Sequence, residues 1–237
     1  VLPVDIRLSA HTNKLRFRPR AYSYLGEVPT LDVFEAPITD WDLVMKWLFD
    51  RIAGALILVL ISPVMALVAL AVKLDSPGPV LYRQRRYGFN NNVFTVFKFR
   101  TMHHRVATGG GVPQARRADP RVTRIGSFLR RTSMDELPQL WNVLRGEMSI
   151  VGPRPHAVEH NEEYAKLISQ YLGRHRVKPG ITGWAQVNGL RGETDTPEKM
   201  ERRVLFDLYY IDNWSLLLDL RIILRTLFVG FVHENAY

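Results

Sequence analysis

Cysteine is absent from the 237-residue chain, and this absence excludes two kinds of chemistry. Without thiols there are no disulfide bonds and no thiolate metal sites, and nothing points to an oxidising compartment. The first 40 residues lack an apolar core, so we expect no signal peptide there. The glycine and lysine spacing of a phosphate-binding loop is missing as well.

Disorder is excluded by the composition, because 46% of the residues are hydrophobic and 23% are charged. Acidic residues are scarce in one part of the chain. Residues 73–155 contain 15 basic and 5 acidic residues, whereas residues 1–72 and 156–237 are close to neutral. The whole chain carries a net charge of +9. A basic block of this kind favours an anionic partner: a nucleic acid, an acidic lipid or a phosphorylated substrate.

A run of 21 residues without charge extends from Ile52 to Val72, between Arg51 and Lys73. As a straight helix it would measure about 31 Å, which matches the apolar thickness of a bilayer. Ser62 and Pro63 interrupt the run at its middle, where proline removes a backbone donor. Basic residues flank both ends, so the positive-inside rule selects neither end as external. Three interpretations remain open: a re-entrant helix that bends and returns to the same face, a spanning helix, and a buried helix of a soluble protein.

Hydrophobic periodicity and turn residues predict the other elements. We expect strands at Val80–Tyr87 and Val93–Arg100 in a hairpin, a loop at 107–120, an irregular glycine-rich stretch at 178–192, and helices at Ser133–Leu144, Val158–Arg174, Thr196–Ile211 and Trp214–Val232. The last helix is amphipathic and suits either a membrane surface or a core position. The expected fold class is α+β.

Two adjacent carboxylates, Asp135 and Glu136, follow Arg130 and Arg131 in the basic block. Carboxylates act as nucleophiles toward phosphoryl groups, and a second carboxylate can hold Mg²⁺. A structural alternative exists, because Ser133 and Glu136 have the spacing of a capping box, in which the glutamate only satisfies a backbone N–H.

A second motif places Arg154 between Pro153 and Pro155. An arginine held by two prolines can clamp a phosphate with two parallel hydrogen bonds, although a plain turn with a surface arginine fits equally well. The segment Phe97–Met102 alternates like a strand with one basic face, and a solvated face is the simpler interpretation.

From about residue 46 to residue 237 the chain closely resembles the bacterial sugar transferases, which are monotopic phosphoglycosyl transferases. The resemblance rests on the Ser62-Pro63 break and on the segments SPGPVLYRQRRYG, FKFRTM, RRTSMDELPQLWNVLRGEMSIVGPRP, KPGITGWAQVNG and GFVHENAY. The last third is most similar to the enzymes that load glucose-1-phosphate onto undecaprenyl phosphate to start exopolysaccharide synthesis.

The resemblance implies a domain organisation and a location. Residues 1–45 would be the tail of a preceding domain, residues 46–75 a re-entrant membrane helix broken at Ser62 and Pro63, and residues 76–237 a mixed α/β catalytic domain with interfacial helices. The catalytic domain would lie on the cytoplasmic face of the bacterial inner membrane, and the protein could form a homo-oligomer.

The resemblance also implies residue roles. Asp135 would attack the β-phosphate of a UDP-sugar, expected to be UDP-glucose, and release UMP, while Glu136 would help to hold Mg²⁺. Binding of the substrate phosphate and of the polyprenyl phosphate is expected of Arg130, Pro153, Arg154 and Pro155.

Two alternatives from other functional classes share the central basic block. One is a basic nucleic-acid-binding protein with a membrane tether, and the other is a membrane scaffold without chemistry of its own. The sequence has no helix-turn-helix or RNA-binding signature, so we expect no nucleic acid as partner. Neither alternative explains the Asp135-Glu136 pair.

Overall fold

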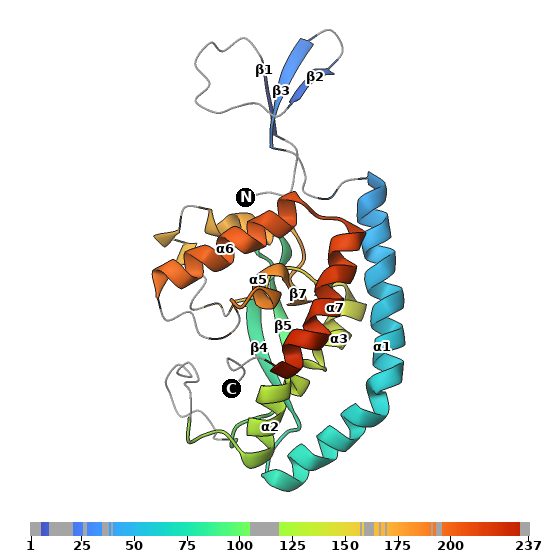
Figure 1. Cartoon of the computed structure of the whole chain (residues 1–237), viewed down its shortest axis with the longest axis vertical. Coiled ribbons are helices and arrows are strands. Elements are labelled where there is room, and N and C mark those ends of the chain that lie inside the picture. Colours follow the sequence, from blue (N-terminus) through green and yellow to red (C-terminus); the bar gives the residue numbers. More distant parts are fainter. Residues whose placement is uncertain are drawn as a thin grey trace.

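The structure is a computed structural model, shown in Figure 1. It describes residues 6–9, 21–25, 28–34, 38, 40–104, 119–156, 158, 164–165, 167–168, 170–190, 192 and 196–232. Nearly all of the expected loop at 107–120 lies outside the described residues, as does much of the expected helix at Val158–Arg174.

The described elements mix helices with small sheets, as predicted. In chain order they are β1 (Ile6–Ser9), β2 (Ala21–Leu25), β3 (Val28–Phe34), α1 (Asp40–Asp75), β4 (Leu81–Tyr87), η1 (Phe89–Asn91), β5 (Val93–Phe99), α2 (Arg124–Thr132), η2 (Met134–Glu136), α3 (Gln139–Arg145), β6 (Ser149–Val151), η3 (Tyr171–Arg176), β7 (Gly180–Thr182), α5 (Trp184–Val187), α6 (Pro197–Asp212) and α7 (Leu216–Val232). The strands pair as an antiparallel β1-β3-β2 sheet, an antiparallel β4-β5 hairpin and a parallel β6-β7 pair.

The apolar run forms most of α1, a helix of 36 residues with Pro63 inside it. Figure 1 shows that this helix bends near its middle. Pro63 has no N–H to donate to the carbonyl of Val59, four residues earlier. The hydroxyl of Ser62 donates to that same oxygen at 2.8 Å. The Ser62-Pro63 pair therefore removes a backbone hydrogen bond and replaces it from a side chain, which lets the helix continue through a bend.

Both halves of α1 pack against the rest of the chain. Before the bend, Phe49 and Ala53 contact a cluster of buried apolar side chains that includes Val143, Val151 and Ile211. After the bend, Val68 and Val72 are buried in a second cluster with Leu129 of α2. Apolar side chains elsewhere on the helix are exposed: Leu56, Val59, Leu60, Leu67 and Leu70. The helix is long and apolar enough to cross a membrane, and these exposed side chains argue against the soluble-core interpretation.

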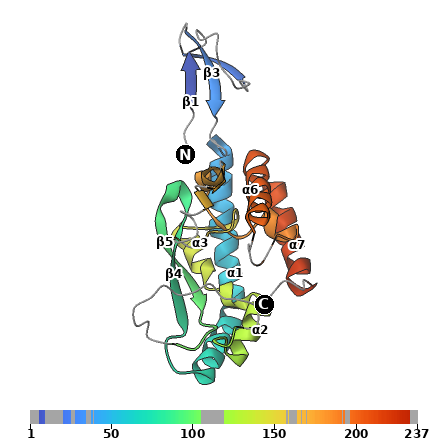
Figure 2. The same ribbon diagram turned by 90° about the vertical axis from the view of Figure 1, so that its left-hand side faces the viewer.

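The hairpin is confirmed, with β4 and β5 paired from Leu81↔Phe99 to Tyr87↔Val93. Its turn passes through Asn90 and Asn91, whose φ angles of 52° and 57° suit asparagine better than most residues. In Figure 2 the hairpin lies on one side of α1, and α6 and α7 lie on the other.

A short parallel pair joins residues about 30 positions apart in the chain. Ser149 pairs with Gly180 and Val151 with Thr182. A Cβ added at Gly180 would lie 2.1 Å from the backbone nitrogen of Gly152, so this close approach requires glycine. The stretch at 178–192, which we expected to be irregular, therefore contains β7 and α5.

The two C-terminal helices, α6 and α7, agree with their predicted ranges to within two residues. One face of α7 is buried through Asp219 and Ile222, while Leu217, Leu220 and Leu224 are exposed. The carboxylate of Asp219 is fully buried, where it accepts from Lys46 Nζ at 2.5 Å. This ion pair joins α7 to the first half of α1.

Candidate active site

The Asp135-Glu136 pair lies in a short turn between two helices. Helix α2 ends at Thr132 and is followed by Ser133, which has a left-handed φ of 59°. Met134–Glu136 then forms a single 3₁₀ turn before α3 begins at Gln139. The expected continuous helix at Ser133–Leu144 is therefore wrong over its first half. The left-handed residue turns the chain out of α2 and presents the two carboxylates at a corner instead of along a helix face.

Glu136 is buried between two cations that come from different parts of the chain. Lys98 of β5 donates to Oε1 at 2.6 Å. Arg154 donates from Nη2 to Oε1 at 2.5 Å and from Nη1 to Oε2 at 2.9 Å, which is a bidentate pair. The capping-box alternative is wrong, because Ser133 makes no side-chain capping bond and the carboxylate of Glu136 faces the two cations.

Asp135 is half-buried, and no described residue makes a hydrogen bond to its carboxylate. Burial and the negative charge of Glu136 raise the pKa of Asp135 to about 6. Burial also opposes ionisation of Glu136, but Arg154 and Lys98 hold its pKa well below the usual range. The two neighbouring carboxyls thus have opposite shifts, which is how one site gives two acids different roles. At neutral pH most Asp135 carboxyls are ionised, and no described residue occupies their oxygens, as a nucleophile requires.

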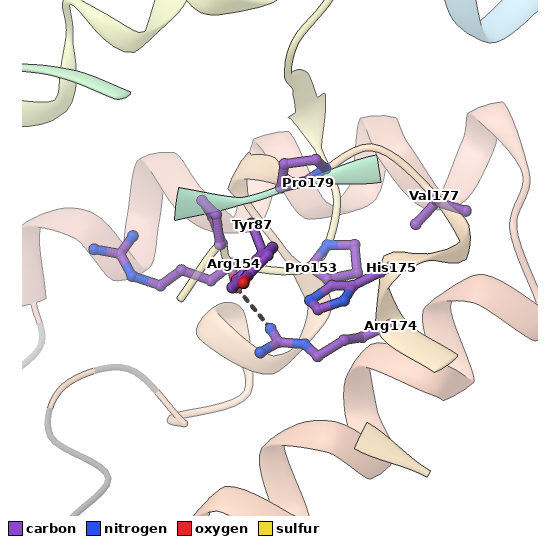
Figure 3. A pocket seen from close by; sticks show the side chains of 9 residues that line it. Tyr87, Pro153, Arg154, Arg174, His175, Val177 and Pro179 are labelled. Carbon is purple, nitrogen blue, oxygen red and sulfur yellow. Dashed lines mark hydrogen bonds between the residues drawn. The ribbon is translucent and has the colours of Figure 1, made fainter. Parts of the chain in front are cut away.

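The segment Pro153–Pro155 directly follows β6 and is anchored to β7. Gly180 donates its N–H to the carbonyl of Pro153 at 2.9 Å. Both prolines are buried and Arg154 is half-buried. Figure 3 shows the side chain of Arg154 extending away from a small pocket lined by Pro153, His175 and Val177. The motif is thus a rigid loop with a directed arginine, and the plain-turn alternative is not supported.

Lys98 belongs to the site, although the alternation of its strand predicts a solvated face. The strand alternation correctly placed Lys98 and Arg100 on one face, but both side chains are paired. Arg100 is buried and donates to the carbonyls of Val72 and Ser76 at the end of α1, at 3.1 and 2.6 Å. Arg130, in the last turn of α2, is half-buried, and its positive charge favours ionisation of Asp135.

A sequence model described as bacterial sugar transferase matches residues 41–233, which contain every residue of this site. The chain belongs to the bacterial sugar transferase family.

Two of the chain's relatives share a name that describes a sugar-phosphate transfer, and a third is named for exopolysaccharide production. The chain is 56% identical over 213 residues to a UDP-glucose:undecaprenyl-phosphate glucose-1-phosphate transferase of Escherichia coli (strain K12), covering 90% of this chain and 46% of the relative. It is 52% identical over 235 residues to a protein of the same name from Caulobacter vibrioides, covering 99% and 82%. It is 49% identical over 188 residues to the exopolysaccharide production protein PSS of Rhizobium leguminosarum, covering 78% and 94%. The chain spans about half the length of the E. coli relative.

Asp135 and Glu136 are the carboxylates that the described part of this site presents to Mg²⁺. Among the described residues no three His, Asp or Glu side chains lie together. Both oxygens of Glu136 accept from Lys98 and Arg154, so these pairs would have to open for Glu136 to hold the metal, and that role stays a prediction. No described residue donates a hydrogen bond to Asp135. Because Mg²⁺ is often held by one carboxylate together with substrate phosphates and water, Asp135 fits it.

Proposed function

We propose that this chain carries the catalytic part of an enzyme that transfers glucose-1-phosphate from UDP-glucose to undecaprenyl phosphate and releases UMP. The observation that carries the proposal is the half-buried carboxylate of Asp135, to which no described residue donates a hydrogen bond, beside the Lys98–Glu136–Arg154 cluster. Family membership and the names of the relatives support the choice of the two substrates.

The reaction proceeds in two displacements at one phosphorus atom. A carboxylate oxygen of Asp135 attacks the β-phosphorus of UDP-glucose, the bond from that phosphorus to the bridging oxygen breaks, and UMP leaves with the electron pair. Glucosyl phosphate is then bound covalently to Asp135. A phosphate oxygen of undecaprenyl phosphate attacks the same phosphorus, the bond to Asp135 breaks, and the carboxylate is regenerated.

The charges around the site match these anionic substrates. Asp135 and Glu136 are outnumbered by the nearby cations Arg86, Lys98, Arg130 and Arg154. The fork of Arg154 that now holds Glu136 has the geometry to bind two phosphate oxygens. Bound Mg²⁺ would neutralise part of the diphosphate charge, with Asp135 as its protein ligand. A surplus of positive charge in a partly buried site stabilises the negative charge that develops on the departing phosphate.

The path of α1 supports a re-entrant membrane segment. Lys46, near its start, donates to the carbonyl of Val151 at 3.1 Å, and Arg100 holds the carbonyls of Val72 and Ser76 at its end. A straight spanning helix would place its two ends on opposite sides of about 30 Å of lipid, where a domain on one side could not contact both. We therefore place the domain at the cytoplasmic face of the inner membrane, where a soluble nucleotide sugar and a lipid-linked phosphate meet.

The proposal is tested with the purified chain, undecaprenyl phosphate and Mg²⁺ in a panel of UDP-sugars, with release of UMP as the signal. UDP-glucose should give the highest rate. With UDP-glucose alone, mass spectrometry should find a hexose phosphate on Asp135, and Asp135→Asn should abolish both signals. The control is Asp212→Asn, which changes an exposed carboxylate at the end of α6.

Three results would contradict this assignment. Ordinary activity in Asp135→Asn would exclude the nucleophile. A preference for another UDP-sugar would correct the substrate. Failure of every UDP-sugar, together with stoichiometric and steeply salt-dependent DNA binding, would favour the nucleic-acid alternative. Failure without DNA binding would favour the scaffold.

A further inference from the structure

The loop Pro153–Pro155 depends on other elements for its hydrogen bonds. Two of its three residues are prolines without an N–H, and none of the three belongs to a helix or strand. Its three carbonyls nevertheless all accept hydrogen bonds, each from a different element. Gly180 of β7 donates to Pro153, Arg174 of η3 donates to Arg154, and Arg86 of β4 donates to Pro155. The backbone that follows the Arg154 side chain is therefore held by two arginines, and the backbone that precedes it is held by Gly180.

Arg174 is almost fully buried, and its own partners fix its direction. Its Nη2 donates to the carbonyl of Arg154 at 2.6 Å, shown as a dashed line in Figure 3, and to Asp207 Oδ2 at 2.7 Å. Its Nη1 lies 2.6 Å from Nδ1 of His156. Burial and the charge of Arg174 hold the pKa of His156 well below its usual range, so the ring is neutral and can accept. A planar guanidinium with partners on both arms has one orientation.

Arg86 is oriented in a similar way from the opposite side. Its Nε and Nη2 both donate to Oε1 of Gln84, at 3.2 and 2.9 Å, and this glutamine lies two positions earlier on the same face of β4. The remaining arm, Nη1, donates to the carbonyl of Pro155. The side chain of Gln84 thus directs Arg86 toward the loop.

The two arginines connect the position of the loop to the direction of the Arg154 side chain. The two arginines meet consecutive carbonyls, one on Arg154 itself and one on the next residue, while the Arg154 fork grips Glu136. Any tilt of the loop would rotate that fork. We propose that Arg86 and Arg174 are positioning residues that aim the guanidinium of Arg154 at the substrate phosphate, an inference that rests on the proposed function.

The test compares Arg86→Lys and Arg174→Lys, which keep the charge but lose the planar fork. Each should lower kcat/KM for UDP-glucose by about 10- to 100-fold, the loss expected when a reacting group is misplaced by about an ångström. The fall should appear in KM as well as in kcat, because a misdirected guanidinium weakens the phosphate contact in the bound substrate and weakens it further in the transition state. The matched control is Arg85→Lys, which alters an exposed arginine on the other face of β4 and should change nothing.

A double-mutant cycle separates positioning from general stabilisation. UDP-glucose binding is measured by calorimetry in the Asp135→Asn chain, where no turnover occurs. Arg86→Lys and Arg174→Lys should each weaken binding about 10-fold when Arg154 is present, and less than about 2-fold in Arg154→Ala. Equal losses in both backgrounds would overturn the positioning role. If Arg174→Lys lowers the melting temperature sharply, Arg86→Lys and Gln84→Leu decide the question. Absence of UDP-glucose binding to the Asp135→Asn chain, and of turnover in the unsubstituted chain, would instead contradict the proposed function.

Discussion

Replacing Asp135 by asparagine should abolish turnover and also stabilise the fold. Burial, and then the charge of Glu136, raise the pKa of Asp135 from 3.8 to about 6. Each pKa unit corresponds to about 1.4 kcal/mol, so ionising this carboxyl in the folded chain costs at most about 3 kcal/mol. The side chain is part-exposed, and solvent screening reduces the expected gain to about 1–3 kcal/mol. Asparagine has nearly the same shape and carries no charge.

The stability gained by Asp135→Asn should increase as the pH rises. The folded pKa of Asp135 lies above the unfolded value, so the cost is absent below about pH 4, grows between pH 4 and pH 6, and is complete above. Melting temperatures of the Asn variant and the unsubstituted chain, measured with chelator, should coincide near pH 4. They should separate by about 2–4 °C per kcal/mol above pH 7.

Replacing the neighbouring carboxylate, Glu136, should have the opposite effect on the stability of the fold. Arg154 and Lys98 hold the pKa of Glu136 well below its usual range, so its ionised form stabilises the fold above that range. Glu136→Gln leaves two half-buried cations without a counter-ion, so the loss of stability at neutral pH should approach but not exceed the cost of breaking a fully buried pair, about 3–5 kcal/mol. This loss should shrink as the pH falls through the folded pKa of Glu136. A stability gain in Asp135→Asn that is the same at pH 4 and pH 8, or a loss in that variant equal to the loss in Glu136→Gln, would refute this reasoning.

Two further predictions concern the guanidinium of Arg154 and the apolar helix α1. Arg154→Lys should lower kcat/KM by about 10- to 150-fold, because an ammonium group cannot make the bidentate pair. Near-normal kinetics in this variant would show that Arg154 is only a surface charge. Because the chain has no cysteine, single Asp42→Cys and Leu74→Cys substitutions can report topology by labelling. Both should react from the cytoplasmic side, and replacing Ser62 and Pro63 by Ala and Leu should move one to the periplasmic side. Labelling from opposite sides in the unaltered helix would identify a spanning segment.

Elements with a strong local pattern could be predicted from the sequence. The hairpin has alternating strands around asparagines that tolerate a left-handed turn. Helix α6 is preceded by its capping residue Thr196, whose side chain accepts from the N–H of Lys199. The parallel pair β6-β7 could not be predicted, because each strand is three residues long and its partner lies about 30 positions away in the sequence. The turn at Ser133 was missed because a left-handed serine interrupts a segment with good helix formers.

The site shows the same division between local and long-range information. Asp135, Glu136 and Arg154 were found because each belongs to a dense short motif. Lys98 and Arg86 were missed as partners, since their contacts join residues 38 and 69 positions apart. A cation on a strand looks like a solvated surface charge until the fold brings a carboxylate or a carbonyl against it. The rule that buried charges must be paired would have found Lys98 only once its burial was known.

The two ends of α1 are tied to the same strands that supply the active site. Near the start of α1, Lys46 donates to the carbonyl of Val151 at the end of β6. Arg154 lies three residues after Val151. At the end of α1, Arg100 holds the carbonyl of Ser76, and Lys98 stands two residues before Arg100 on the same face. Both Lys46 and Arg100 are buried, where an unsatisfied charge would be costly. A change in the path of the apolar helix must therefore move β5 or β6, and with them the two cations that grip Glu136. The position of the apolar helix and the geometry of the Lys98–Glu136–Arg154 cluster are therefore coupled.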